Sequence, residues 1–340
     1  MSAWWSLPVV AVASLTLTGA IRRYARARGL IDIPGSRSSH TVPTPRGGGA
    51  AIAACFLIAL VLFAVFELQS RATLWALLGA GAVVALIGLA DDHGHIAPYW
   101  RLLVHIAAAV WALLWLSGGP AISFFGSVVD TGWVGFGLAV ICLVWLVNLY
   151  NFMDGIDGIA AVEAVCVCVG GAVLYVLVDE SSLAVIPLLL AAATVGFLFW
   201  NIPPAKIFMG DVGSGFLGIT LGLLALQAAL AMPRLLWSWI ILLAVFVTDA
   251  TFTLVRRLLN REKAHEAHRS HAYQHASRRF GHLRVTLVVG AIDLVWLLPI
   301  AVWVGSGNLE GVIGLVIAYV PLIGVAAWFR GGKPEERTAS

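Results

Sequence analysis

The sequence predicts an all-α polytopic membrane protein with about eleven transmembrane helices. Of its 340 residues, 60% are hydrophobic and only 11% are charged, and the mean hydropathy is +0.93. A soluble domain contains roughly 25% charged residues and cannot shield this much apolar surface from water. The apolar residues form runs near the ~20 residues that a membrane-spanning helix needs. These observations exclude a soluble enzyme, a disordered tail and a peripheral binding module.

Pro, Gly and charged residues separate the apolar runs, as the ends of transmembrane helices require. The first run has no basic residue before it and four arginines after it, so we interpret it as an uncleaved span rather than a secretory signal. The expected spans are 4–20, 48–66, 73–90, 101–117, 133–151, 156–178, 183–200, 213–232, 235–255, 284–305 and 309–329. Residues 1–330 then form one membrane domain, followed by a flexible cytoplasmic tail over 331–340.

The distribution of positive charge predicts the topology of these spans. With alternate loops assigned to one side, 19 of the 21 Lys and Arg fall on that side, and only Arg71 and Arg234 remain on the other. Cytoplasmic loops are enriched in Lys and Arg. We therefore expect the N-terminus outside and the C-terminus in the cytoplasm.

Asp91 and Asp92 directly follow an apolar run at the cytoplasmic side. Two adjacent carboxylates repel each other unless a cation or a positive ligand lies between them. A solvated loop pair is the plain interpretation. The functional alternative is a site for a hard cation such as Mg2+, which prefers carboxylate and phosphate oxygens.

The segment 148–158 repeats polar residues at every third position, with Asn148, Asn151, Asp154 and Asp157 in the pattern. Neighbouring members share a helix face, and the glycines at 155 and 158 indicate close approach of backbone to a ligand. An N-capping loop would explain one Asp, but it does not explain two amides and two carboxylates at the end of a membrane helix. We favour a polar site.

A third motif, F-M-G-D-V-G-S-G over 208–215, opens the eighth span with Phe208 and Asp211. Glycines around an acid at a helix N-terminus suit an anionic ligand, its metal ion, or both. An ordinary helix cap is the alternative for the Asp.

Two further cytoplasmic segments contain potential ligands for an anion. The loop 256–284 is basic and rich in histidine, including His268, Arg269 and His271, which can donate hydrogen bonds to a diphosphate. Zinc is disfavoured there because no cysteine accompanies the histidines. The segment 40–49 leads through prolines and Arg46 into glycines that begin a helix, as a connection or as a phosphate-facing backbone.

Together these motifs resemble the polyprenyl-phosphate N-acetylhexosamine-1-phosphate transferases, the glycosyltransferase family 4 group that includes the MraY and WecA enzymes. The matching pieces follow the family order across residues 37–271. They are R-x-x-H-x-x-P-x-P-R-G-G at 37–48, the acidic pair at 91–92, N-x-x-N-x-x-D-G-x-D-G at 148–158, F-M-G-D-x-G-S at 208–214 and H-R-S-H at 268–271.

The resemblance implies that a lipid phosphate, expected to be undecaprenyl phosphate, attacks the β-phosphorus of a UDP-N-acetyl amino sugar and releases UMP. It also implies that Asp211 binds Mg2+, for which Mn2+ can substitute. Asp91 and Asp92 are then a catalytic pair near the lipid phosphate. The residues that match substrate-binding positions are Arg46, Asn148, Asn151, Asp154, Asp157, Phe208, His268, Arg269 and His271.

The late loop distinguishes branches of this family. MraY enzymes have a run of consecutive histidines there, whereas Arg269 and Ser270 separate His268 from His271 in this chain. We therefore expect the branch that initiates O-antigen or related polysaccharides, in the bacterial inner membrane, and keep the MraY reaction as an alternative. UDP-GlcNAc is the default donor, with N-acetylfucosamine and N-acetylquinovosamine donors also open. Family members often form homodimers, and no nucleic-acid partner is expected.

A transporter or flippase is the alternative from a different class. Its candidates are His105, Glu163, Asp249 and Asp293, which lie in or near spans. A transporter would concentrate polar groups near the middle of the bilayer, whereas the motifs gather at one face. For Asp249, pairing with Arg256 two helical turns later is the simpler expectation.

Overall fold

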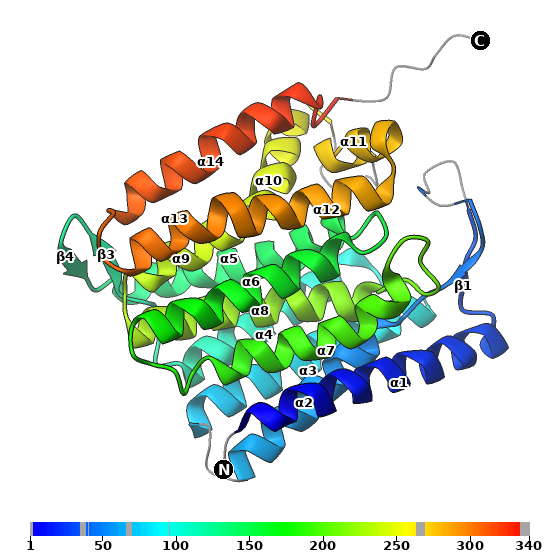
Figure 1. Cartoon of the computed structure of the whole chain (residues 1–340), viewed down its shortest axis with the longest axis horizontal. Helices are drawn as coiled ribbons and strands as arrows, with labels where there is room; N and C mark the ends of the chain where they lie inside the picture. Colours follow the sequence, from blue (N-terminus) through cyan, green and yellow to red (C-terminus); the bar gives the residue numbers. More distant parts are fainter. Residues whose placement is uncertain are drawn as a thin grey trace.

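In the computed structural model, residues 3–34, 39, 41–65, 70–94, 96–262 and 269–333 are described, and they form a bundle of α-helices with two short β-hairpins. Figure 1 shows most of the helices running side by side along the long axis. The first eight helices are α1 (Ser6–Arg28), α2 (Gly49–Val65), α3 (Arg71–His93), α4 (Pro98–Trp115), α5 (Gly132–Met153), α6 (Ile159–Leu177), α7 (Val185–Asn201) and α8 (Asp211–Ala231). The later ones are α9 (Leu235–Leu242), α10 (Ala244–Leu259), α11 (Ala272–Phe280), α12 (His282–Ile292), α13 (Leu298–Gly305) and α14 (Gly311–Trp328).

Seven helical segments in the described residues are long and apolar enough to cross a membrane, and eight if a bent pair counts as one span. The chain is thus an all-α, multi-pass membrane protein, as the composition predicts. All eleven predicted segments are helical, but α2 and α7 have only 17 residues each. The predicted span 235–255 is two helices, α9 and α10, which meet at 69°. The span 284–305 passes through a π-helical turn, η2 (Asp293–Leu297), between α12 and α13.

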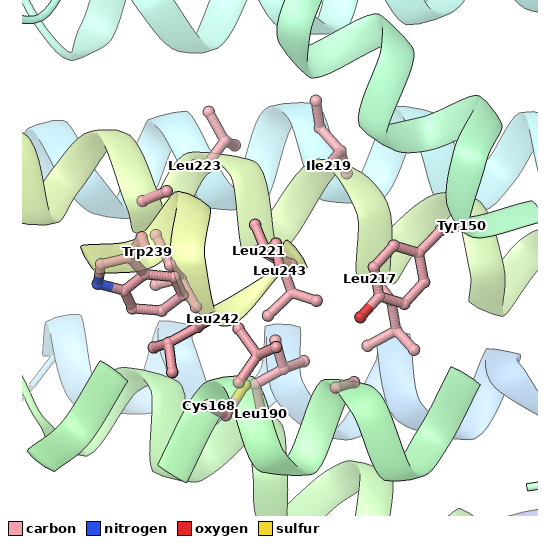
Figure 2. Packing of buried hydrophobic residues seen from close by; sticks show 14 of the residues in the cluster. Tyr150, Cys168, Leu190, Leu217, Ile219, Leu221, Leu223, Trp239, Leu242 and Leu243 are labelled. Atoms are coloured by element: carbon pink, nitrogen blue, oxygen red, sulfur yellow. The ribbon is translucent and has the colours of Figure 1, made fainter. Parts of the chain in front are cut away.

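The centre of the bundle is α8, of which 18 of 21 residues are buried. It packs against α2, α3, α5 and α9. Figure 2 shows Leu221 and Leu223 of this helix on the side of Trp239 and Leu242, the last residue of α9, and Leu217 beside Tyr150. Lipid tails are as apolar as these side chains, so close packing rather than the hydrophobic effect favours such contacts in a bilayer.

Two hairpins lie at opposite ends of the bundle (Figure 1). The hairpin of β1 (Ile31–Asp32) and β2 (Thr44–Pro45) lies at the end that holds α11 and the last turn of α14. The hairpin of β3 (Ile122–Phe124) and β4 (Ser127–Val129) lies at the other end. The sequence predicted neither hairpin, nor the short helix α11.

The start of the expected C-terminal tail is ordered against the bundle. Gly331 and Gly332 are buried, and the Gly332 N–H donates to the carbonyl of Ser270 at 2.7 Å. The remainder of that tail, 334–340, lies outside the described residues.

Candidate active site

The site is built around the first turn of α8, where the ends of α2 and α3 meet it. Gly49 begins α2 and Gly88 lies near the end of α3, and a Cβ atom on either would collide with the backbone of Gly213 or Asp211. Gly210, just before α8, has a φ of 77°, a conformation that favours glycine. The glycines of G-D-x-G-S and its neighbours therefore allow three helices to converge.

Asp92 caps α8 from a neighbouring helix. Its carboxylate accepts hydrogen bonds from the N–H groups of Asp211 at 3.1 Å and Val212 at 3.2 Å, and the residue is 4% exposed. The first N–H groups of a helix have no partner within it, and this end bears partial positive charge. Arg46 adds a link, because its Nη2 donates to the Asp92 carbonyl at 2.7 Å. Asp92 thus fixes the place of Asp211.

Arg101 joins the other two acids. Its Nη1 donates to Asp91 Oδ2 at 2.7 Å and to Asp211 Oδ2 at 2.9 Å. The second oxygen of Asp211 accepts from Asn151 Nδ2 at 2.8 Å. A guanidinium between two carboxylates offsets their mutual repulsion. Asp211 therefore points in a defined direction while its side chain stays 31% exposed.

A cavity of about 300 Å³ opens over this centre. It contains eight of the twelve residues expected to act in the reaction: Arg46, Asp92, Asn151, Asp154, Asp157, Phe208, Asp211 and Arg269. They come from segments between 46 and 269, so the fold gathers the separate motifs at one site. A second cavity of about 700 Å³ shares Ser39, Asp157 and Phe208 with the first.

The other four expected residues are not in that lining. Asp91 faces Arg101 and also accepts from the N–H of Ile96 at 2.7 Å. Asn148 donates to the carbonyl of Val144 on its own helix and lines a small neighbouring cavity with Arg101 and His105. His271 is 3% exposed and packs against Phe152. His268 lies outside the described residues.

Several lining residues were not anticipated from the sequence. Asp32, Ser39, Asn201 and Gln274 line the first cavity. Asn201 fixes the loop before α8, since its Oδ1 accepts from Gly158 N at 2.9 Å and its Nδ2 donates to the carbonyl of Ile207 at 2.9 Å. An amide at the end of an apolar run on the side predicted to be cytoplasmic, as in 148–158, is the signal that could have identified it.

The electrostatics of the cavity are strongly acidic. Its lining brings together five aspartates, at positions 32, 92, 154, 157 and 211, and only two arginines, Arg46 and Arg269. This is an excess of three negative charges when all are ionised. Burial, and then the charges of Asp211, Asp92 and Asp157, raise the pKa of Asp154 well above its usual range. Such a cavity favours cations.

The donor set suits a hard cation that is completed by other ligands. Within the described ranges, no group of three or more His, Cys, Asp or Glu is arranged to hold a metal ion. Mg2+ is commonly bound through one or two carboxylates together with water and substrate phosphates. The exposed carboxylate of Asp211, oriented by Asn151, fits that chemistry.

Comparisons with known proteins agree with this geometry. Residues 74–229 match the model of "Glycosyl transferase family 4". The chain is 31% identical over 291 residues to a probable undecaprenyl-phosphate N-acetylglucosaminyl 1-phosphate transferase of Bacillus subtilis, covering 83% of this chain and 79% of that protein. The chain belongs to glycosyl transferase family 4.

Two further relatives show the breadth of the match. An undecaprenyl-phosphate alpha-N-acetylglucosaminyl 1-phosphate transferase of Thermotoga maritima is 28% identical, over 84% of this chain and 86% of that protein. A phospho-N-acetylmuramoyl-pentapeptide-transferase of Moorella thermoacetica is 31% identical, over 52% of this chain and 61% of that protein. The family predicted from the motifs is confirmed, and its membership favours a transferase over the transporter alternative.

The four transporter candidates lie in three different surroundings. Glu163 and Asp293 are buried near each other on α6 and η2, and His105 lines the small cavity beside Asp211. The expected pairing of Asp249 with Arg256 is wrong. Asp249 accepts hydrogen bonds from the start of α11, while Arg256 donates to the carbonyl of Gly331 at 3.0 Å.

Proposed function

We propose that this chain transfers GlcNAc-1-phosphate from UDP-GlcNAc to undecaprenyl phosphate, releasing UMP and forming the lipid-diphosphate sugar that initiates a polysaccharide such as an O-antigen. The names of the Bacillus and Thermotoga relatives support the reaction. The observation that carries the proposal is the acidic cavity at the start of α8, which collects the family motifs beside the partly exposed Asp211.

The five aspartates and two arginines in the lining favour entry of a nucleotide diphosphate together with a cation. Asp211 would hold Mg2+, or Mn2+ in its place, and the bound ion would neutralise charge on the diphosphate. Asn151 and Arg101 orient the two oxygens of Asp211. Asp92 holds Asp211 by capping the helix on which it lies.

The donor occupies the two joined cavities in this proposal. Arg46 and Arg269 bind the diphosphate in this proposal, since guanidinium groups can contact phosphate oxygens in a bidentate manner. Phe208 lies at the border of the two cavities, where an aromatic ring can stack on the base. Asp154 and Asp157 offer acceptors to the nucleoside and sugar. Asp157 is held in place, since its Oδ2 accepts from Ala205 N at 3.0 Å.

The transfer is a single displacement. A lipid phosphate oxygen forms a bond to the β-phosphorus, and the bond from that phosphorus to the bridging oxygen breaks, so that UMP leaves with the electron pair. A phosphate monoester has its second pKa near ~6, so much of the acceptor is already dianionic at neutral pH. Both oxygens of Asp92 accept backbone hydrogen bonds, which favours positioning over a role as base. Trapping of a phosphorylated Asp91 or Asp92 during turnover would contradict this.

We place the site at the cytoplasmic face of the bacterial inner membrane, with eleven spans, the N-terminus outside and the C-terminus inside. The two 17-residue helices reach about 26 Å at 1.5 Å per residue, and a short span is accommodated by local thinning of the bilayer. The bent pair α9 and α10 counts as one span.

The proposal is tested by incubating the purified protein with undecaprenyl phosphate, Mg2+ and a panel of UDP-sugars. We expect UMP release that requires the lipid, with UDP-GlcNAc the best donor. A better rate with an N-acetylfucosamine, N-acetylquinovosamine or muramyl-pentapeptide donor would reassign the substrate. If no donor gives lipid-dependent release of UMP, the proposed reaction is wrong.

Replacing Asp211 by Asn should abolish turnover, because the neutral amide loses most of the affinity for Mg2+. UMP release is measured across a Mg2+ titration for wild type and Asp211→Asn. Asp179→Asn, at the exposed end of the α6–α7 connection, is the control and should match wild type. Near-normal turnover of Asp211→Asn at low Mg2+ would remove Asp211 from the metal site.

A further inference from the structure

The short helix α11 is attached to the bundle through one buried carboxylate. Asp249, on α10, is 7% exposed. Its Oδ1 accepts from the N–H of Ala272 at 2.9 Å, and its Oδ2 accepts from the N–H of Tyr273 at 2.8 Å. His271 Nδ1 lies 3.4 Å from Oδ1. Asp249 therefore binds the first turn of α11 through both of its oxygens.

This first turn leads directly to the cavity. The Tyr273 hydroxyl donates to the carbonyl of Phe152 at 2.8 Å. Gly155, in the cavity lining, has no room for a Cβ atom because Tyr273 and Gln274 pack against it. Gln274 lines the same cavity, and its Oε1 accepts from His271 N at 3.2 Å. Any shift of α11 therefore moves one wall of the site.

Arg269 lies just before this anchored turn and is one of the two arginines in the cavity lining. Its chain is fixed on the C-terminal side by His271, which is buried between Asp249 and Phe152. The neighbouring Ser270 accepts from Gly332 N at 2.7 Å through its carbonyl. The two residues that follow Arg269, Ser270 and His271, are thus both held in place. Asp249 makes the hydrogen bonds to the start of α11.

We propose that Asp249 is a positioning residue of the transferase site, which holds α11 so that Arg269 and Gln274 face the donor. A nine-residue helix is too short to be stable in water by itself, so α11 depends on such anchors. His271 is part of the same anchor and does not donate to the diphosphate. The kinetic part of this inference rests on the proposed function, whereas the anchoring of α11 does not.

The experiment compares Asp249→Asn and Asp249→Ala with wild type. The Asn oxygen retains one acceptor for the two N–H groups, and Ala retains none. Asp130→Asn is the matched control, because Asp130 also accepts from a backbone N–H, that of Gly132 at 3.0 Å, near the start of α5. Hydrogen exchange of peptides from α11 and α6 is measured by mass spectrometry, together with the KM for UDP-GlcNAc and kcat.

We expect α11 amides to exchange faster in Asp249→Asn and faster still in Asp249→Ala, with α6 unchanged. The KM should rise about tenfold for Asn and more for Ala, while kcat falls less than threefold, since lost donor contacts weaken ground-state and transition-state binding alike. Asp130→Asn should leave the α11 exchange, the KM and kcat unchanged.

Unchanged α11 exchange in both variants would overturn the anchor. Faster exchange with an unchanged KM would overturn the positioning role, and faster exchange throughout the bundle would assign Asp249 to general stability instead. If wild type releases no UMP with any donor, the proposed function fails, and the exchange data alone then decide whether Asp249 anchors α11.

Discussion

Neighbouring carboxylates in this site are given different roles by their hydrogen-bond partners. Asp91 is bound by Arg101 and by the N–H of Ile96. Asp92 is bound by the first turn of α8. Asp154 lies among three other acids, whose charges add to the effect of burial and raise its pKa. The hydrogen bonds of Asp91 and Asp92 favour their anionic forms, whereas burial and nearby negative charges disfavour the anionic form of Asp154.

Asp154→Asn should stabilise the metal-free protein at neutral pH. A carboxyl whose pKa is higher in the folded than in the unfolded state binds more protons when folded, so stability falls as pH rises above about 4, the unfolded value, and through the folded value. The amide has no such charge. The thermal midpoint in detergent is measured at several pH values with EDTA present. The variant should exceed wild type most at pH 7–8 and approach it at pH 5. An equal difference at all pH values would refute the electrostatic explanation.

For single residues, the sequence predicted well which of them come together in the site. It predicted less well the direction in which each side chain points. Arg46, Asn151, Asp157 and Phe208 were expected at the site and line its cavity. His271 was expected to contact substrate, yet its ring is buried beside Asp249. The motifs identify segments that converge, whereas the direction of each side chain depends on local helix phase and on partners far apart in the chain.

At the scale of elements, the position of α8 depends on a cap supplied by α3. Caps usually come from the residue just before the helix, but here that residue is Gly210, which has no side chain. Asp92 provides the missing acceptor through space. Its bonds couple the acidic pair motif to the G-D-x-G-S motif, which lie more than 110 residues apart.

Asp92→Asn should lower both stability and activity, because the Asn oxygen can accept from only one of the two N–H groups. The loss of a cap costs about 0.5–2 kcal/mol, and the displaced Asp211 should bind Mg2+ more weakly. Thermal midpoints and Mg2+-dependent UMP release are measured in parallel. Full recovery of the rate at high Mg2+ would support a positioning role for Asp92, and a rate that stays near zero at saturating Mg2+ would restore it as a direct participant.

Helix breaks and short surface helices were the least predictable elements. The residues 239–247 around the break are all apolar and include no Pro or Gly, so hydropathy predicted one span where α9 and α10 meet at 69°. The nine residues of α11 mix polar and apolar side chains and follow a loop rich in charge. Their helical state depends on tertiary anchors such as Asp249, which no local pattern reveals.

For the whole molecule, the hydropathy pattern predicted the fold class well because the bilayer imposes it. Backbone groups in lipid must be satisfied within a helix, so long apolar runs have few alternatives. Large hydrophobic side chains remain exposed on the outer helices, for example Leu114 at 66% and Ile141 at 65%. These surfaces face lipid in a membrane protein, and their exposure is expected.

The proposed topology can be checked by labelling in intact cells. Ser127→Cys lies in the β3–β4 hairpin and Arg279→Cys in α11, at opposite ends of the bundle, and both positions are exposed. In a background without the exposed Cys142, a membrane-impermeant maleimide should modify position 127 at once and position 279 only after permeabilisation. The opposite order would invert the topology.

The acidic cavity has a consequence for the order of events during turnover. With five aspartates and two arginines in its lining, the site favours a free cation over a free nucleotide. In the proposed reaction, a cation and the nucleotide would then bind as a thermodynamically coupled pair, in which each raises the affinity for the other by the same factor. In the proposed reaction, departure of UMP would therefore lower the affinity of the site for a cation.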